Sequence, residues 1–407
     1  MLPRNEVQTN EDNYFINEEL YHRFPVTRQA FATISYQDTG ELSYMGFIQK
    51  MSMNMVNKMK NCEPGYTQID NALDMAANSL NLILGTYGFP NSQFLKWNPL
   101  YIPDTFLNSK VNLSPENLTV LVKNAAELYG ADLTGIADLN TRWVYSQDMV
   151  KPFVITEDGR AEETEREFHI PKNINRAIVM AFVMDSDLQN NSPEVSASTA
   201  ASLGYSRMGI TAVSLAEYIR ALGYQAIPCM NDTALSIPLA IDAGLGQLGR
   251  HGLLITPEYG SNVRLCKILT DMPLIPDKPI DFGITDFCEN CLLCAKSCPS
   301  GAISTGERTI KSDYNTSNSG VLKWYIHGES CLRFWQENGA SCANCIKACP
   351  FTNGFEFIHC IECEKCESWK GSCVLQSNTE TRVKYGYLEF PEIRSRAKIL
   401  RVSRRGL

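Results

Sequence analysis

The pattern of apolar and polar positions divides the chain into a weakly periodic region and a region of well-defined elements. Up to about residue 110 the sequence is polar and aromatic, and only residues 69–84 have the apolar spacing of a helix. From Ser114 onward, helical and strand-like patterns alternate, which indicates a layered core of helices and sheet. We therefore interpret residues 1–113 as a layer that covers this core.

Several elements of the core can be placed. A helix is expected after Ser114, because a serine before a proline is typical of an N-cap followed by the first helical position. Residues 176–184 form a nearly continuous apolar run, which is typical of a strand buried on both faces. Three prolines within residues 273–282 end the pattern, so we assign the core to residues 114–282. The remaining expected elements are strands at 132–136 and 252–256 and helices at 196–222 and 236–243.

The cysteines are concentrated in one stretch of the chain. Of the 15 cysteines, 12 lie between Cys288 and Cys373. A chain of 407 residues can bury a large core without disulfide cross-links, so this uneven distribution indicates a metal-cluster module. Two sets of cysteines end in the Cys-x3-Cys-Pro pattern of bacterial ferredoxins. We therefore expect residues 283–355 to form a ferredoxin-like domain with two 4Fe-4S clusters.

The two cysteine sets are expected to exchange one ligand each. In two-cluster ferredoxins, the fourth cysteine of a run binds the cluster of the other run. Structural zinc also uses Cys-x2-Cys pairs, but it takes one compact set of four ligands and does not require the Cys-Pro ending. On the ferredoxin rule, one cluster has Cys288, Cys291, Cys294 and Cys349 as ligands, and the other has Cys331, Cys342, Cys345 and Cys298.

Residues 356–407 carry a third group of cysteines and a basic end. Cys360, Cys363, Cys366 and Cys373 lack the Cys-Pro ending, and we favour reduced thiols there over zinc or a further cluster. Basic residues outnumber acidic ones after residue 381, which favours a solvated end, with contact to anionic lipid or a partner as the alternative.

Charge and hydropathy exclude some functions. The net charge of -8 argues against general nucleic-acid binding through a basic surface. No apolar run reaches the roughly 18 residues of a membrane span. The first residues have neither an apolar signal region nor twin arginines, so the sequence is expected to be soluble and without an export signal.

A glycine motif, Gly244-Leu-Gly-Gln-Leu-Gly249, follows a predicted helix and precedes a predicted strand. This order is the reverse of a dinucleotide-binding turn, so NAD and FAD are disfavoured. Close approach of the backbone to another phosphate-bearing cofactor is the preferred interpretation for Gly244, Gly246 and Gly249. None of the five histidines lies in an Asp-x-His-x-x-Gly motif, so a protein histidine beneath a corrinoid cobalt is unsupported.

The sequence resembles the corrinoid-dependent respiratory reductive dehalogenases over roughly residues 115–355. The resemblance lies in Gly204-Tyr-Ser-Arg-Met208, the run from Gly223 to Asn231, Ala243-Gly-Leu-Gly246, the run from Ile255 to Arg264, and residues 277–283 before the first cluster motif. It implies a nitroreductase-like α/β corrinoid-binding core in an α+β chain, and a base-off corrinoid held mainly through backbone contacts. The twin-arginine signal of that family is not found here, and the sequence after Phe351 departs from its pattern.

The resemblance also implies roles for individual residues. Tyr205 corresponds to the proton donor, Asn231 to its polar neighbour, Arg264 to its cationic partner and Trp335 to an aromatic residue of the substrate pocket. Reductive dehalogenation needs two electrons and a proton, and a tyrosine hydroxyl with a reference pKa near 10 releases its proton more readily beside an arginine. An aromatic pocket suits a small, uncharged organohalide.

Other interpretations remain open beside this one. Epoxyqueuosine reductase also combines a corrinoid domain with two clusters, but it expects an acidic donor where Tyr205 lies and a basic tRNA-binding surface. An electron carrier or corrinoid-binding chaperone is the non-enzymatic alternative. The resemblance further implies a low-potential electron donor, a membrane anchor protein and location at the outer face of the cytoplasmic membrane, and it is compatible with a homodimer or with a cytoplasmic relative.

Overall fold

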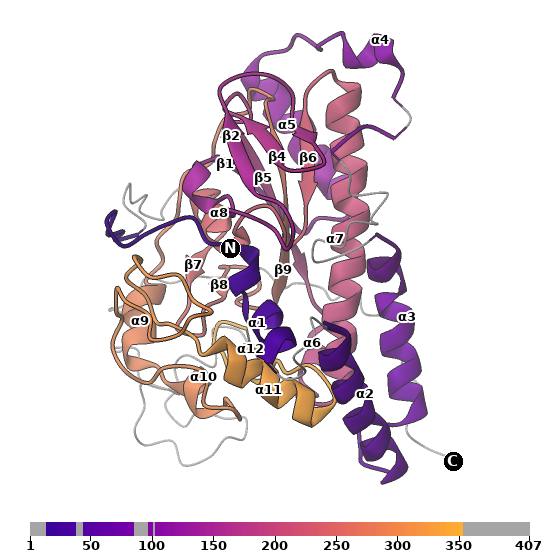
Figure 1. The fold of residues 1–407 in the computed structure, drawn as a ribbon, viewed down its shortest axis with the longest axis vertical. Coiled ribbons are helices and arrows are strands. Elements are labelled where there is room, and N and C mark those ends of the chain that lie inside the picture. Colours follow the sequence, from indigo (N-terminus) through magenta and orange to yellow (C-terminus); the bar gives the residue numbers. More distant parts are fainter. Residues whose placement is uncertain (1–13, 38–43, 85–96, 101, 353–407) are drawn as a thin grey trace, which may run out of the picture.

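The computed structural model describes residues 14–37, 44–84, 97–100 and 102–352 (Figure 1). Its central element is a four-stranded sheet in which every neighbouring pair is antiparallel. The register pairs Ile136 with Ile178 and Phe182 with Arg264. The strand order is β1 (Leu133–Asp138), β5 (Arg176–Val183), β9 (Val263–Thr270) and β6 (Ala226–Cys229).

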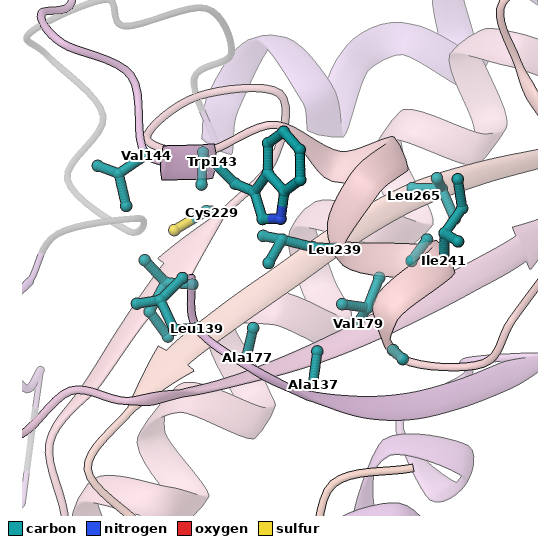
Figure 2. Close-up of a cluster of buried hydrophobic side chains, with 14 of the residues drawn as sticks. Ala137, Leu139, Trp143, Val144, Ala177, Val179, Cys229, Leu239, Ile241 and Leu265 are labelled. Carbon is teal, nitrogen blue, oxygen red and sulfur yellow. The ribbon is translucent and has the colours of Figure 1, made fainter. Parts of the chain in front are cut away.

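Alternate residues of β5 pack into two hydrophobic cores, one on each face of the sheet. Val179 belongs to the core that includes Trp143 and Leu239, which Figure 2 shows. Met180 belongs to the opposite core, which includes Leu118 and Met208. Every residue from Ala177 to Phe182 is buried, which confirms the predicted strand buried on both faces.

Helices cover both faces of the sheet. The core with Met180 is closed by α5 (Pro115–Leu128) and α7 (Val195–Ala221), and the core with Val179 by α8 (Ser236–Asp242). Ser114 caps α5 by accepting a hydrogen bond from the Asn117 backbone N–H, with proline in the first turn, as predicted. The fold is therefore a mixture of helix and antiparallel sheet, which agrees with the α+β class.

The N-terminal region is more helical than its sequence pattern indicates. Besides the predicted helix, observed as α3 (Gln68–Leu84), it contains α1 (Ala30–Gln37) and α2 (Tyr44–Lys60), which the weak periodicity did not predict. Figure 1 shows α3 running beside α7, and α1 and α2 contact α11 (Gly328–Asn338). These helices therefore contact both α7 of the core and α11 of the cysteine-rich region, and the division of the chain at residue 113 stays a prediction.

The cysteine-rich region consists of short helices joined by loops. The helices α9 (Ile284–Asn290) and α10 (Leu293–Lys296) carry the first cysteine set, and α12 (Asn344–Lys347) lies within the second. The helices α10 and α12 contact each other, so the two sets are brought side by side.

Two strands of the central sheet, β6 and β9, were not predicted. Pro228 interrupts β6, and Arg264 and Lys267 interrupt the apolar run of β9, so neither has a simple strand pattern. The strand expected at 252–256 is reduced to β8 (Leu254–Ile255), paired with β7 (Gln247–Leu248). The remaining elements are η2 (Val26–Arg28), α4 (Asp104–Leu107), η3 (Thr141–Trp143), β2 (Phe153–Thr156), β3 (Glu162–Glu163), β4 (Phe168–Pro171) and α6 (Ser186–Gln189).

Candidate active site and iron-sulfur centres

The structure gathers the cysteines of the two predicted clusters into two neighbouring groups. The first group, Cys288, Cys291, Cys294 and Cys349, lines one pocket. In the second group, the thiols of Cys331 and Cys345 are close enough to those of Cys342 and Cys298 to interact with them electrostatically. Each group therefore combines three cysteines of one set with the last cysteine of the other.

The chemistry of the first group fits an iron-sulfur cluster. Burial raises the pKa of Cys288 and Cys294 to about 12, because a thiolate there loses its hydration. Buried thiolates therefore need nearby positive charge, which iron ions supply. Within the described residues, no three His, Cys, Asp or Glu side chains are arranged to hold a single metal ion. The four thiols instead surround a shared space, as ligands to separate corners of a cube must do.

The pocket of the first group also contains two polar residues that the sequence analysis did not single out as site residues. Arg250 is 2% exposed and His251 is 5% exposed, and both line the pocket. Burial lowers the pKa of His251 to about 4, so its ring is neutral at physiological pH. Their only sequence signal is their position directly after Gly249.

The three residues predicted to form the catalytic site meet in the structure. Tyr205 lies on α7, Asn231 follows β6, and Arg264 lies on β9. Asn231 Nδ2 donates a hydrogen bond of 2.8 Å to the Tyr205 hydroxyl oxygen. The Arg264 guanidinium carbon lies 3.9 Å from the centroid of the Tyr205 ring, so the cation covers the ring face. The tyrosine thus has an amide donor at its oxygen and a positive charge on its ring.

Gly204, directly before Tyr205, makes room for Arg264. A β-carbon on Gly204 would lie 2.7 Å from Arg264 Cγ, which is too close for the side chain to keep its place. Because the clash is with the inner part of the arginine side chain, the Arg264 side chain would have to shift from its present position. Sequence reasoning used Gly204 only as part of a motif.

Lys267, three residues after Arg264 on β9, supports the segment that carries Asn231. This lysine is fully buried, and its Nζ donates to the Met230 carbonyl oxygen at 2.6 Å and to Ser236 Oγ at 3.1 Å. Burial lowers its pKa, and the Asp232 carboxylate counteracts that effect. The lysine therefore ties the end of β6 to the start of α8, on either side of Asn231.

The other predicted site residues lie in different surroundings. Trp335, on α11, packs in a cluster with Phe31 and Phe47, and its ring centroid is 5.9 Å from that of Phe31. The buried Trp335 Nε1 has no hydrogen-bond partner among the described residues. The role of Trp335 in a substrate pocket remains a prediction.

The three motif glycines are approached closely by the protein itself. A β-carbon would lie 2.3 Å from the Lys278 carbonyl oxygen at Gly244 and 2.1 Å from the Ile255 carbonyl oxygen at Gly246. At Gly249 it would lie 2.7 Å from the His251 ring. The requirement for glycine at these positions is thus explained by internal packing, and contact of the three residues with a cofactor stays a prediction.

Some predictions lie outside the described residues. These concern the thiols Cys360, Cys363, Cys366 and Cys373, the basic end after residue 381 and the first 13 residues. Among the helices that the structure describes, none combines the length and apolar character needed to cross a lipid bilayer.

The fold and the cysteine groups define a class of protein: an α+β core joined to a two-cluster iron-sulfur domain. Comparisons with known proteins agree with this class. Residues 287–353 match the 4Fe-4S dicluster domain family, and residues 130–274 match the family described as reductive dehalogenase subunit. The region that carries Tyr205, Asn231 and Arg264 therefore belongs to the reductive dehalogenase family.

Individual relatives support this family assignment. The chain is 39% identical over 326 residues to tetrachloroethene reductive dehalogenase of Sulfurospirillum multivorans, covering 74% of this chain and 65% of that protein. It is 37% identical over 271 residues to the enzyme of the same name from Dehalobacter restrictus, covering 58% of this chain and 48% of the relative. The chain therefore spans only about half to two thirds of these relatives.

A solved structure supports the fold. A reductive dehalogenase whose structure is described as suggesting a mechanism for B12-dependent dehalogenation matches with a TM-score of 0.61 and 22% identity. The match covers 86% of this chain and 44% of that one. At this level of identity the likeness establishes the fold of the chain.

Proposed function

We propose that the chain is a corrinoid-dependent reductive dehalogenase that replaces a carbon-bound halogen of a small organohalide by hydrogen. The observation that carries the proposal is the contact of Tyr205 with both Asn231 and Arg264, in a region that belongs to the reductive dehalogenase family. The reaction consumes R–X, two electrons and a proton, and it yields R–H and a halide ion. A bound corrinoid would supply the strong reductant for the carbon-halogen bond.

Tyr205 is the proton donor in this proposal. Its hydroxyl proton goes to the substrate carbon, and a phenolate remains on the enzyme. The Asn231 amide already donates to the phenolic oxygen, and this hydrogen bond becomes stronger when the oxygen carries a negative charge. The Arg264 cation over the ring also favours the anion. Both neighbours therefore stabilise the product of proton transfer more than the starting hydroxyl.

The remaining predicted residues complete the binding region in this proposal. Trp335 contributes an aromatic wall for an uncharged substrate, and such a wall helps to exclude water from the reaction. Gly244, Gly246 and Gly249 belong to the segment beside the corrinoid. The closer relation of the core to the nitroreductase fold belongs to the same proposal, and it is consistent with the antiparallel sheet covered by helices.

Electrons reach the core through the two clusters. Cys345 is within electrostatic reach of Cys294, so members of the two cysteine groups are neighbours and the clusters they hold would exchange electrons readily. A low-potential donor would supply the electrons. Association with a membrane anchor protein at the outer face of the cytoplasmic membrane, and a homodimer, follow from the family resemblance and are part of the proposal.

The replacement Tyr205→Phe tests the proton donor. It removes one hydroxyl, so iron content and corrinoid binding should be unchanged, while halide release with a reduced low-potential dye should fall at least about a hundredfold. Tyr218→Phe, on the same helix and beside the same core, is the matched control and should keep its activity. Full halide release by the Tyr205→Phe enzyme would contradict the proposed role.

The visible spectrum separates this proposal from an electron carrier. After anaerobic reconstitution with iron, sulfide and cobalamin, the dehalogenase should have corrinoid bands in addition to the broad iron-sulfur absorption. Iron-sulfur absorption alone would favour the carrier. An epoxyqueuosine reductase would bind corrinoid but would release no halide from a panel of organohalides.

A further inference from the structure

The pocket of the first cysteine group contains one hydrogen-bond donor that the protein does not use. His251 Nδ1 accepts a hydrogen bond from the Leu253 backbone N–H at 3.2 Å, so Nδ1 carries no proton. In the neutral ring the proton is therefore on Nε2. This atom is buried and has no hydrogen-bond partner among the described residues. A buried donor without a partner destabilises the fold, which indicates that something in the pocket accepts its hydrogen bond.

The local backbone fixes the His251 ring in this place. A β-carbon on Gly249 would lie 2.7 Å from His251 Cε1 and 3.1 Å from Nδ1, so only glycine leaves the ring its space. The ring and the thiols of Cys288, Cys291, Cys294 and Cys349 line the same pocket. A cluster held by these thiols presents several sulfur atoms that can accept a hydrogen bond.

Arg250 places an unneutralised positive charge beside the same pocket. Its guanidinium donates to four backbone carbonyl oxygens and forms no ion pair with any residue of the described part of the chain. It lies over Trp324, with its central carbon 4.5 Å from the ring centroid. The charge lies beside the thiols, because Arg250 Nε donates to the Cys288 backbone carbonyl oxygen at 2.8 Å and Arg250 lines the same pocket as Cys288 and Cys291.

The second cysteine group has different surroundings. Its thiols accept hydrogen bonds from the Ala302 backbone N–H, which lies 3.3 Å from Cys298 Sγ, and from Ser192 Oγ, which lies 4.0 Å from Cys342 Sγ. The charged groups of the described chain that act on Cys331 and Cys345 are other thiols, with no cation among them. Reduction adds negative charge to a cluster, so a nearby cation and an N–H···S hydrogen bond favour the reduced state. The two clusters should therefore differ in potential.

We propose that His251 Nε2–H donates a hydrogen bond to a sulfur atom of the cluster held by Cys288, Cys291, Cys294 and Cys349. This bond and the charge of Arg250 raise the reduction potential of that cluster above the potential of the second. The inference rests on the two-cluster part of the proposed function and does not depend on the dehalogenation reaction.

The test measures cluster potentials without corrinoid or organohalide. The full chain is reconstituted with iron and sulfide, and each cluster takes up one electron in a titration followed by electron paramagnetic resonance. His251→Phe removes the donor, and it should lower the potential of one cluster enough to change its reduced fraction at least tenfold, about 59 mV for one electron. His251→Gln keeps an N–H in nearly the same place and should restore most of the shift. A parallel Cys331→Ser variant assigns the signals, because it alters only the second cluster.

Two further measurements keep the inference testable if the phenylalanine variant loses its cluster. Gly249→Ala moves the ring while leaving His251 in the chain, and it should lower the same potential. In the unmodified chain with 15N-labelled histidine, electron-nuclear double resonance should detect a histidine nitrogen and an exchangeable proton coupled to the reduced cluster. His169→Phe, at a surface ring bonded to Glu162 and Glu167, is the control and should change nothing. Unchanged potentials in the His251 variants with full iron, or no such coupling, would overturn the inference even if dehalogenation were proven.

Discussion

At the scale of single residues, the candidate site depends on one missing β-carbon. Arg264 reaches the ring of Tyr205 across the position where a side chain of residue 204 would stand, and glycine is the one residue that leaves this path open. Tyr205 and its neighbour Gly204 therefore act together: one supplies the hydroxyl, and the other admits the cation that would stabilise its anion.

The replacement Gly204→Ala distinguishes the effect of Gly204 on the position of Arg264 from its effect on the stability of the fold. Alanine is favoured over glycine inside a helix by up to about 1 kcal/mol, so α7 itself should tolerate the change. The new β-carbon would displace the Arg264 side chain, and halide release should fall at least tenfold, which corresponds to about 1.4 kcal/mol of lost stabilisation. Urea unfolding and steady-state rates, measured on the same preparation, distinguish the two effects.

Leu203→Ala, one position earlier and 45% exposed, is the control for Gly204→Ala. It should leave the rate within about twofold. If Gly204→Ala retained the full rate, Arg264 would not need its place over the ring, and its assigned role would be wrong.

At the scale of elements, β9 carries both the charge of the site and its support. Arg264 and Lys267 lie on this central strand, and Lys267 bonds to the segments before and after Asn231. A buried lysine in the middle of a sheet loses its hydration, and it is tolerated because the Met230 carbonyl, Ser236 and the nearby Asp232 carboxylate replace the lost water.

Lys267→Met tests this support. Methionine fills a similar volume but donates no hydrogen bond, so the Met230 carbonyl loses a partner and the nearby half-buried Asp232 loses a favourable charge interaction. Removal of one partner from such a buried set costs roughly 3–5 kcal/mol. The free energy of unfolding should fall by about this amount, and halide release should fall as well because Asn231 loses its fixed position.

Lys172→Met is the control for the buried lysine. Lys172 pairs with Glu157 at the surface, where both side chains are more than half exposed, so its loss should change the free energy of unfolding by less than about 0.5 kcal/mol. Equal changes in the free energy of unfolding for the two substitutions would show that the buried contacts of Lys267 stabilise the fold no more than a surface ion pair does.

The sequence patterns predicted the regular elements and the cysteine groups, but not the strand that carries Arg264 and Lys267. Regular periodicity located α3, α5, α7, α8 and β5, and cysteine spacing located the four-residue groups that the fold brings together. The strand β9 was missed because Arg264, half-buried at the candidate site, and Lys267, fully buried, break its apolar run. His251 was missed as a site residue because its unused donor becomes visible only when its partners in space are known.

At the scale of the whole molecule, the exchange of ligands between the cysteine sets links distant parts of the chain. Cys298 and Cys349 each end one set and lie with the thiols of the other, so neither set alone completes a cluster. The 32-residue separation between Cys298 and Cys331 contains the loop that carries Trp324, which covers Arg250 beside the first group. Cluster assembly and folding of this region should therefore be coupled.

Single replacements of the exchanged cysteines test the arrangement. Cys349→Ala should abolish the same resonance signal as Cys288→Ala, although Cys349 belongs to the second sequence motif. Cys298→Ala should instead abolish the signal that Cys331→Ala removes. Each replacement should lower the iron content from about eight atoms per chain toward about four, because a cube without one thiolate is readily lost.

Cys266→Ala provides the control for these replacements. This cysteine is fully buried in the core behind β9, where its Sγ faces the Met208 carbonyl oxygen at 3.8 Å, and it should leave both signals and the iron content unchanged. If Cys349→Ala removed the signal that depends on Cys331, each motif would build its own cluster. In that case the grouping of thiols in the fold would not reflect the bound state. A signal shared by Cys349 and Cys288 is expected only if the two halves of the domain assemble as a single unit, so this one comparison tests that arrangement.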